Sequence, residues 1–244
     1  MSYEGYYLLL LISFLITLGA QILVKVRFSK YGGIENSQGI TGREMARKIL
    51  DENGLSDVRI IPTRGELTDN YNPMNRTVNL SESTYNSNSI AAVSVAAHEC
   101  GHAIQHKERY LFLRIRLGMV PILNVTANLS YFAILIGYFA GLLQMFEIGI
   151  ILESVSVLFN LITLPVEFDA SRRGMSNLKK SNMFEKEEIS SSRKMLTAAA
   201  LTYVGAALSA IVSILRLILI IICCQCGAHA ICTEGTDGLC LVIA

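Results

Sequence analysis

The sequence carries few charges for its length. Of its 244 residues, 17% are Asp, Glu, Lys or Arg, whereas 52% are hydrophobic. This balance excludes an ordinary soluble domain of the same size, and the charges are almost absent from four long apolar runs. A bilayer core needs roughly 20 apolar residues of helix. We therefore predict four transmembrane helices, over residues 6–24, 117–146, 148–166 and 195–216.

Basic residues are missing ahead of the first apolar run, whereas Lys25, Arg27 and Lys30 follow it. A cleaved signal peptide has basic residues before its apolar stretch. This order therefore argues against a cleaved signal and favours an uncleaved anchor with its N-terminus outside.

Lysine and arginine are also missing from the turn near Glu147. They collect instead in residues 25–116, which hold 13 of them, and in residues 167–194, which hold 7. The positive-inside rule then places both segments in the cytoplasm. We expect an integral multi-pass protein of a bacterial-type plasma membrane, with both termini outside.

The segment between the first two runs, residues 25–116, predicts a small α+β domain. Thr41 and Glu44 have the spacing of a capping box at a helix start, and Gly54 suits the position just past the helix end. The remaining elements are predicted as a strand at Asp57–Ile61, a turn at Thr68–Asn75, a strand at Arg76–Ser81, a helix over about residues 89–107, and an exposed helical connection at residues 176–194.

The helix over 89–107 contains the sequence AAHECGHAIQH, which includes an HExxH motif. His98 and His102 lie one turn apart and differ by about 40° in direction, so both imidazoles can reach one metal ion. Glu99 lies about 100° round the helix, where it can reach a water on the open side of the metal. A Zn²⁺ ion there lowers the pKa of its water, and Glu99 acts as the general base for attack on a peptide carbonyl.

A catalytic zinc site needs a third protein ligand, and Glu167 is the candidate. His102 precedes the second predicted span and Glu167 follows the third, so the two spans form a hairpin that leaves one membrane face and returns to it. Both residues therefore emerge on the same side. The alternative for Glu167 is an ordinary carboxylate at the membrane interface.

The stretches AAHECGHAIQH, PVEFDASRR and LTAAALTYVGAAL together resemble the YugP-like family of neutral zinc metallopeptidases of bacterial membranes, over about residues 1–220. The chain is more distantly similar to the HtpX and CAAX prenyl endopeptidase group, whose third ligand is the Glu of a Glu-x-x-Ala-Asp motif. Glu167 and Ala170 fit that motif, but Ser171 stands in place of the Asp. The resemblance implies that Asp169 or Ser171 orients a ligand histidine.

The expected fold is a mainly α membrane protein, with about four transmembrane helices and a small α+β cytoplasmic, zincin-like domain that carries the HExxH helix. Within that domain, Thr77, Val78, Asn79 and Leu80 are candidates for a strand that pairs with an extended substrate, the alternative being a purely structural strand. Tyr203 and Arg193 are candidate donors to the transition state, with Arg172 and Arg173 as alternatives.

Several further polar residues have a simpler interpretation. His106 lies too far along the helix to share the ion, so we expect it to be solvated or to face substrate. Cys100 is expected in the core, with a redox-sensitive thiol as the alternative. Glu153 and Arg216 are expected near the outer membrane interface. The apolar, cysteine-rich tail at 217–244 matches no motif clearly; a second metal site, disulfides or a lipid-modified tail all stay open.

The sequence thus predicts a membrane-embedded zinc metalloendopeptidase, with a peptide or membrane protein as substrate, the lipid bilayer as its environment and no nucleic-acid partner. The alternative is a non-catalytic zinc-binding membrane scaffold or adaptor, which would not need Glu99. A transporter or channel fits less well, because it would need paired charges or broken helices near the midplane. The substrate and the oligomeric state stay open.

Overall fold

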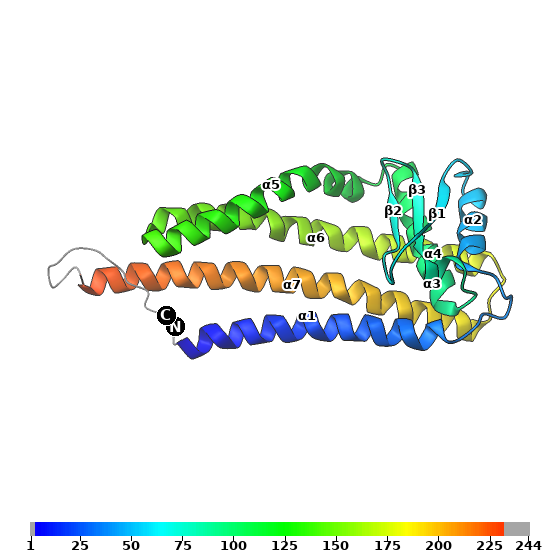
Figure 1. The fold of residues 1–244 in the computed structure, drawn as a ribbon, viewed down its shortest axis with the longest axis horizontal. Helices are drawn as coiled ribbons and strands as arrows, with labels where there is room; N and C mark the ends of the chain where they lie inside the picture. Colours follow the sequence, from blue (N-terminus) through cyan, green and yellow to red (C-terminus); the bar gives the residue numbers. More distant parts are fainter. Residues whose placement is uncertain (1–2, 232–244) are drawn as a thin grey trace. The chain divides into compact units, whose positions relative to one another are not determined.

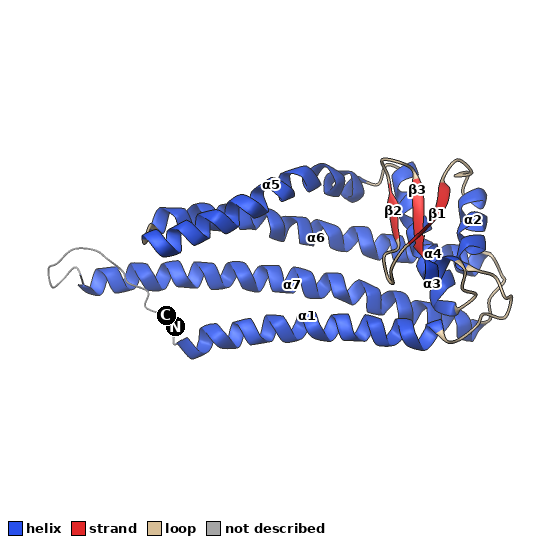
Figure 2. Ribbon diagram, in the orientation of Figure 1, coloured by secondary structure: helices blue, strands red, loops and turns tan. Residues whose placement is uncertain are grey.

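The computed structural model describes residues 3–231 and is mainly helical (Figures 1 and 2). Three short strands, red in Figure 2, interrupt the helices. In chain order the elements are α1 (Tyr3–Gly32), α2 (Gly42–Glu52), β1 (Arg59–Thr63), β2 (Asn70–Asn72), β3 (Thr77–Ser81), α3 (Glu82–Tyr85), α4 (Ile90–Lys107), α5 (Leu111–Ala140), α6 (Leu143–Lys180) and α7 (Lys186–Ile231).

The chain divides into two compact units. The first comprises Met1–Thr17, Arg116–Leu161 and Gly205–Ala244, and the second comprises Leu18–Ile115 and Ile162–Val204. The first unit holds apolar helix segments. The second holds the sheet, α2, α3 and α4, together with the C-terminal parts of α1 and α6 and the N-terminal parts of α5 and α7. The elements that position the candidate site therefore all belong to the second unit.

Within residues 3–231, four helices are long and apolar enough to cross a membrane: Leu8–Gly32, Leu111–Gly137, Leu143–Lys180 and Lys186–Leu219. This agrees with the predicted number of spans, but the boundaries differ. The second and third apolar runs were predicted to separate near Glu147, whereas the turn lies at Gly141, where φ is +66°. Glycine adopts this left-handed conformation without a Cβ clash, so α5 ends before it and α6 begins at Leu143.

The connection over 176–194 is largely helical, as predicted, but it is formed by the ends of two long helices and not by a helix of its own. Helix α6 continues to Lys180 and α7 already begins at Lys186, so most of that segment is helical and only a short turn separates the two helices. Most of the cysteine-rich tail falls outside the described residues. This applies to the side chains of Cys223, Cys224, Cys226 and His229 and to the whole of Cys232.

The sheet has the order β1-β3-β2, with β1 parallel and β2 antiparallel to β3. The predicted turn at Thr68–Asn75 therefore contains a short strand. Its turn chemistry is confirmed just after that strand, where the Asn72 side chain accepts hydrogen bonds from the backbone N–H groups of Met74 and Asn75. The first strand lies two residues later than predicted, and the last begins at Thr77 because Arg76 has a φ of +51°.

Helix α2 begins as the sequence predicts. The Thr41 hydroxyl accepts from the Glu44 backbone N–H, and the Glu44 carboxylate accepts from the Thr41 backbone N–H. Gly54 follows the helix end with a φ of +64°. The apolar face of α2 packs on α4, as seen on the right of Figure 1, and the shared core contains Met45, Ile49, Leu50, Val78, Leu80, Val93, Ala96, Cys100 and Ile104.

The face of α4 turned away from α2 lies unusually close to α6. A Cβ added to Gly101 would lie 2.3 Å from the carbonyl oxygen of Ala170, and one added to Gly174 would lie 2.7 Å from that of Ala97. Each helix therefore presents one glycine to the backbone of the other. Small residues at these positions on both helices let the two backbones approach closely.

This contact predicts that Gly101→Ala destabilises the protein. An added methyl group ordinarily stabilises a helix, but here it must push α4 and α6 apart, at a cost of about 1–3 kcal/mol. The thermal unfolding midpoint of the purified protein in detergent should fall. Gly19→Ala is the matched control, because nothing lies within 4 Å of its added Cβ. Equal midpoints for the two variants would contradict the close approach.

Candidate metal centre

Helix α4 presents two histidines on the side that faces α6. The His98 and His102 rings lie one turn apart, with centroids 4.8 Å from each other and planes at 84°. Glu167, on α6, is only 2% exposed and reaches between them. Its Oε2 lies 3.3 Å from His98 Nε2 and 3.6 Å from His102 Nε2.

These three side chains fit a metal ion by both distance and chemistry. One ligand atom from each of His98, His102 and Glu167 lies within 4.8 Å of the others. Two imidazole nitrogens and one carboxylate oxygen are a common zinc donor set. Tetrahedral ligands with bonds of about 2.05 Å are about 3.3 Å apart, close to the observed separations from the carboxylate oxygen to the two ring nitrogens.

The side-chain amide of Gln105 determines the tautomer of His102. Gln105 Nε2 donates to the Val166 carbonyl oxygen at 2.8 Å and to Asp169 Oδ2 at 3.0 Å, so its Oε1 must face the imidazole. That oxygen lies 3.0 Å from His102 Nδ1 and can only accept. Nδ1 therefore carries the proton, and Nε2 keeps a lone pair directed toward Glu167.

Asp169 is itself fixed by two arginines. Arg172 Nε donates to Asp169 Oδ1 at 3.2 Å, and Arg173 Nε donates to Asp169 Oδ2 at 2.5 Å. Arg173 also forms an ion pair with Glu108, just past the end of α4. This chain of contacts leads from the surface through Asp169 and Gln105 to His102, so it holds the ring by hydrogen bonds as well as by packing.

The second predicted orienting residue contacts the other histidine. Ser171 Oγ lies 3.0 Å from His98 Nδ1. Asp169 and Ser171 thus support different histidines. Ser171 contacts His98 directly, whereas Asp169 accepts from Gln105, which contacts His102. Sequence reasoning missed Gln105, although its spacing of three residues from His102 on the same helix was a usable signal.

Glu99 is buried beside the same group of side chains. Burial, the largest effect, and the nearby Glu167 carboxylate raise the pKa of its carboxyl to about 7, although His98 lowers it. The backbone N–H of Tyr71, on β2, also donates to this carboxyl. Glu99 therefore lies where α4 meets β2, at the edge of the sheet.

The predicted substrate strand is wrong. Thr77, Val78, Asn79 and Leu80 belong to β3, which pairs with β1 on one side and β2 on the other. Its backbone groups are engaged within the sheet, and Val78 and Leu80 are in the core, so an extended peptide cannot add to it. The sequence identified the strand correctly but did not reveal its position in the sheet.

The remaining predicted residues lie in several places. Arg193 lines a pocket that Ser171 also lines, and Tyr203 lies further along α7; their role as transition-state donors stays a prediction. His106 Nδ1 shares a hydrogen bond of 2.8 Å with the Tyr71 hydroxyl, away from the three-residue group. Cys100 is fully buried, and burial raises the pKa of its thiol, which favours the core interpretation.

Comparison with known proteins decides the family. The model of a family described as "Putative neutral zinc metallopeptidase" matches residues 6–222. The chain belongs to this family. A curated relative, "Putative membrane protease YugP" of Bacillus subtilis (strain 168), is 47% identical over 201 residues, which cover 82% of this chain and 89% of the relative. No solved structure matches the chain.

The resemblance noted in the sequence is therefore confirmed. A zinc metallopeptidase family and a relative named as a membrane protease agree with two features of this structure, its four apolar helices and the group formed by His98, His102 and Glu167. Zinc, the metal in the family description, also suits the two nitrogens and one oxygen that this group offers.

The Gln105 contacts predict that Gln105→Leu weakens zinc binding by roughly 10- to 100-fold, because the Nδ1 proton of His102 loses its acceptor. Competition with a fluorescent zinc chelator measures the affinity directly. The exposed Gln38→Leu substitution is the control and should bind zinc as the wild type does. An unchanged affinity in Gln105→Leu would show that the ring needs no such support.

Proposed function

We propose that this protein is a membrane-embedded zinc metalloendopeptidase. The observation that carries the proposal is the convergence of His98 and His102 from α4 with Glu167 from α6, beside the buried carboxyl of Glu99. We expected from the sequence that these two separate segments share one zinc ion. The distances from Glu167 Oε2 to the two Nε2 atoms support that arrangement.

In the proposed mechanism His98, His102 and Glu167 hold the metal. Zinc, when bound, supplies Lewis acidity that activates a water and polarises the peptide carbonyl. Glu99 accepts the proton of the attacking water and delivers it to the leaving amine nitrogen. Gln105 keeps the proton of His102 on Nδ1 throughout, so that Nε2 stays available.

The sheet offers a binding edge for an extended peptide at β2 rather than at β3. β2 lies at the edge of the sheet, contacts α4, and places the Tyr71 backbone beside Glu99. An extended segment that adds to this edge would bring its backbone close to the general base. The substrate class that fits is a peptide or an unfolded segment of a membrane protein.

The proposal separates zinc binding from hydrolysis at Glu99. Glu99→Gln keeps the size of the side chain but cannot accept a proton, so cleavage of a casein-type substrate should fall by roughly 10²- to 10⁴-fold. Zinc content, measured by mass spectrometry of the metal in purified protein, should stay at the wild-type level. Retained cleavage in Glu99→Gln would rule out Glu99 as the base. A wild-type protein that binds zinc but cleaves no substrate would instead favour the non-catalytic scaffold.

Glu167→Ala provides the complementary variant, because it removes one ligand and leaves Glu99 intact. It should lose both zinc and cleavage. The exposed Glu187→Ala substitution on α7 is its control and should lose neither. A full zinc content in Glu167→Ala would remove Glu167 from the ligand set.

The metal centre is proposed to face the cytoplasm, with the N-terminus outside. The support is the distribution of Lys and Arg, 13 in residues 25–116 and 7 in residues 167–194. External protease added to spheroplasts should remove an epitope tag at the N-terminus. A tag inserted after Asn182, in the turn between α6 and α7, should be removed only after lysis. The reverse pattern would place the metal centre outside.

A further inference from the structure

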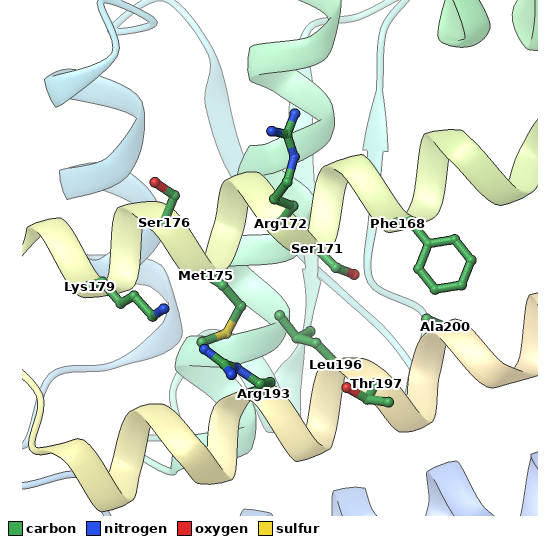
Figure 3. Close-up of a pocket in the computed structure, with 10 residues that line it drawn as sticks. All are labelled: Phe168, Ser171, Arg172, Met175, Ser176, Lys179, Arg193, Leu196, Thr197 and Ala200. Atoms are coloured by element: carbon green, nitrogen blue, oxygen red, sulfur yellow. The ribbon is translucent and has the colours of Figure 1, made fainter.

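A pocket of about 420 Å³ lies between α6 and α7 within the second unit (Figure 3). Helix α6 contributes its C-terminal part and α7 its N-terminal part, so the pocket borders the ends of two apolar helices. The lining residues are Phe168, Ser171, Arg172, Met175, Ser176, Lys179, Arg193, Leu196, Thr197 and Ala200.

The polarity of the pocket changes along its length. Phe168 and Ala200 form one end, next to the apolar runs of their helices, and Figure 3 shows the Phe168 ring directed between α6 and α7. Lys179 and Arg193 lie toward the other end and extend into the space between the helices. Phe168 and Lys179 are 11 residues apart on α6, which corresponds to about 16 Å.

The lining of the polar end carries only one sign of charge. Arg172, Lys179 and Arg193 are cationic, and the lining set contains no carboxylate. Arg172 is engaged by Asp169 on the side toward the metal centre, whereas Lys179 and Arg193 have exposed side chains. The hydroxyls of Ser171 and Thr197 supply further donors, so the lining is suited to an anion with several oxygen atoms.

We propose that this pocket binds an anionic phospholipid, with its phosphate at Lys179 and Arg193 and its glycerol and first acyl carbons against Phe168 and Ala200. A free phosphate would satisfy the cations but not the apolar end, which is why the lipid is favoured. The site goes beyond the proposed peptidase activity. It adjoins the metal centre through Ser171, which lines the pocket and also contacts His98 Nδ1.

The absence of tryptophan from the chain permits a direct test. Phe168→Trp, in the full-length protein reconstituted in vesicles, places one fluorophore in the pocket. Brominated phosphatidylglycerol should quench it at a mole fraction about fivefold lower than brominated phosphatidylcholine, since each cation near the surface favours the anionic headgroup. Equal quenching by the two lipids would overturn the proposal.

Two charge-matched variants in the Phe168→Trp background locate the effect. Lys179→Gln/Arg193→Gln should abolish the preference for phosphatidylglycerol. Lys180→Gln/Lys194→Gln removes the same charge from the neighbouring positions outside the pocket and should keep it. Loss of the preference in both pairs would mean a general surface charge effect and would overturn the site.

Two further measurements test whether the anion is a lipid headgroup or free phosphate, and whether the wild type, without any substitution, retains the anionic lipid. Inorganic phosphate at millimolar concentration should not relieve quenching by phosphatidylglycerol; full relief would make the pocket a site for free phosphate and overturn the lipid assignment. Native mass spectrometry of the wild type, released from vesicles containing both lipids, should show retained phosphatidylglycerol in excess over phosphatidylcholine. Equal retention would contradict the proposal without any substitution in the pocket.

Discussion

The close approach of α4 and α6 is the constraint on which the proposed metal centre depends. Gly101 meets the backbone of Ala170, and Gly174 meets that of Ala97, so the two helices are in contact at positions on either side of His98 along α4. At this separation a glutamate on one helix reaches imidazoles on the other. A larger residue at either glycine would move Glu167 away from both rings together, because Glu167 and Ala170 lie on the same helix one turn apart.

Hydrogen bonds across the same interface orient the His102 ring. The Gln105 amide has both donor positions used, by the Val166 carbonyl and the Asp169 carboxylate, and this leaves its oxygen for His102. Two partners of that amide therefore lie on α6, the helix that also bears Glu167. The same interface sets the distance between the ligand residues and the protonation of one ring, and the arginines that hold Asp169 extend the support to the surface.

Much of this arrangement could be predicted from sequence, and the reasons are local. The HExxH spacing on a helix, the capping box at Thr41 and Glu44, and the long apolar runs each follow from short-range geometry. Glu167 could be paired with the histidines because a hairpin must return to the face it left. The position of β3 within the sheet could not be predicted, since a short run of strand-forming residues identifies a strand but not its neighbours. The turn at Gly141 was misplaced because the apolar run continues past it to Phe146, so composition shows no boundary there.

The order of the proposed metal ligands along the chain has a consequence for biosynthesis. His98 and His102 leave the ribosome well before Glu167, and the whole of α5 lies between them. A nascent chain that has completed α4 carries two of the three converging side chains. It gains the third only when α6 has returned and packed against Gly101. The three side chains can therefore come together only after the α5–α6 hairpin has formed, and a chain that ends before α6 cannot form the centre.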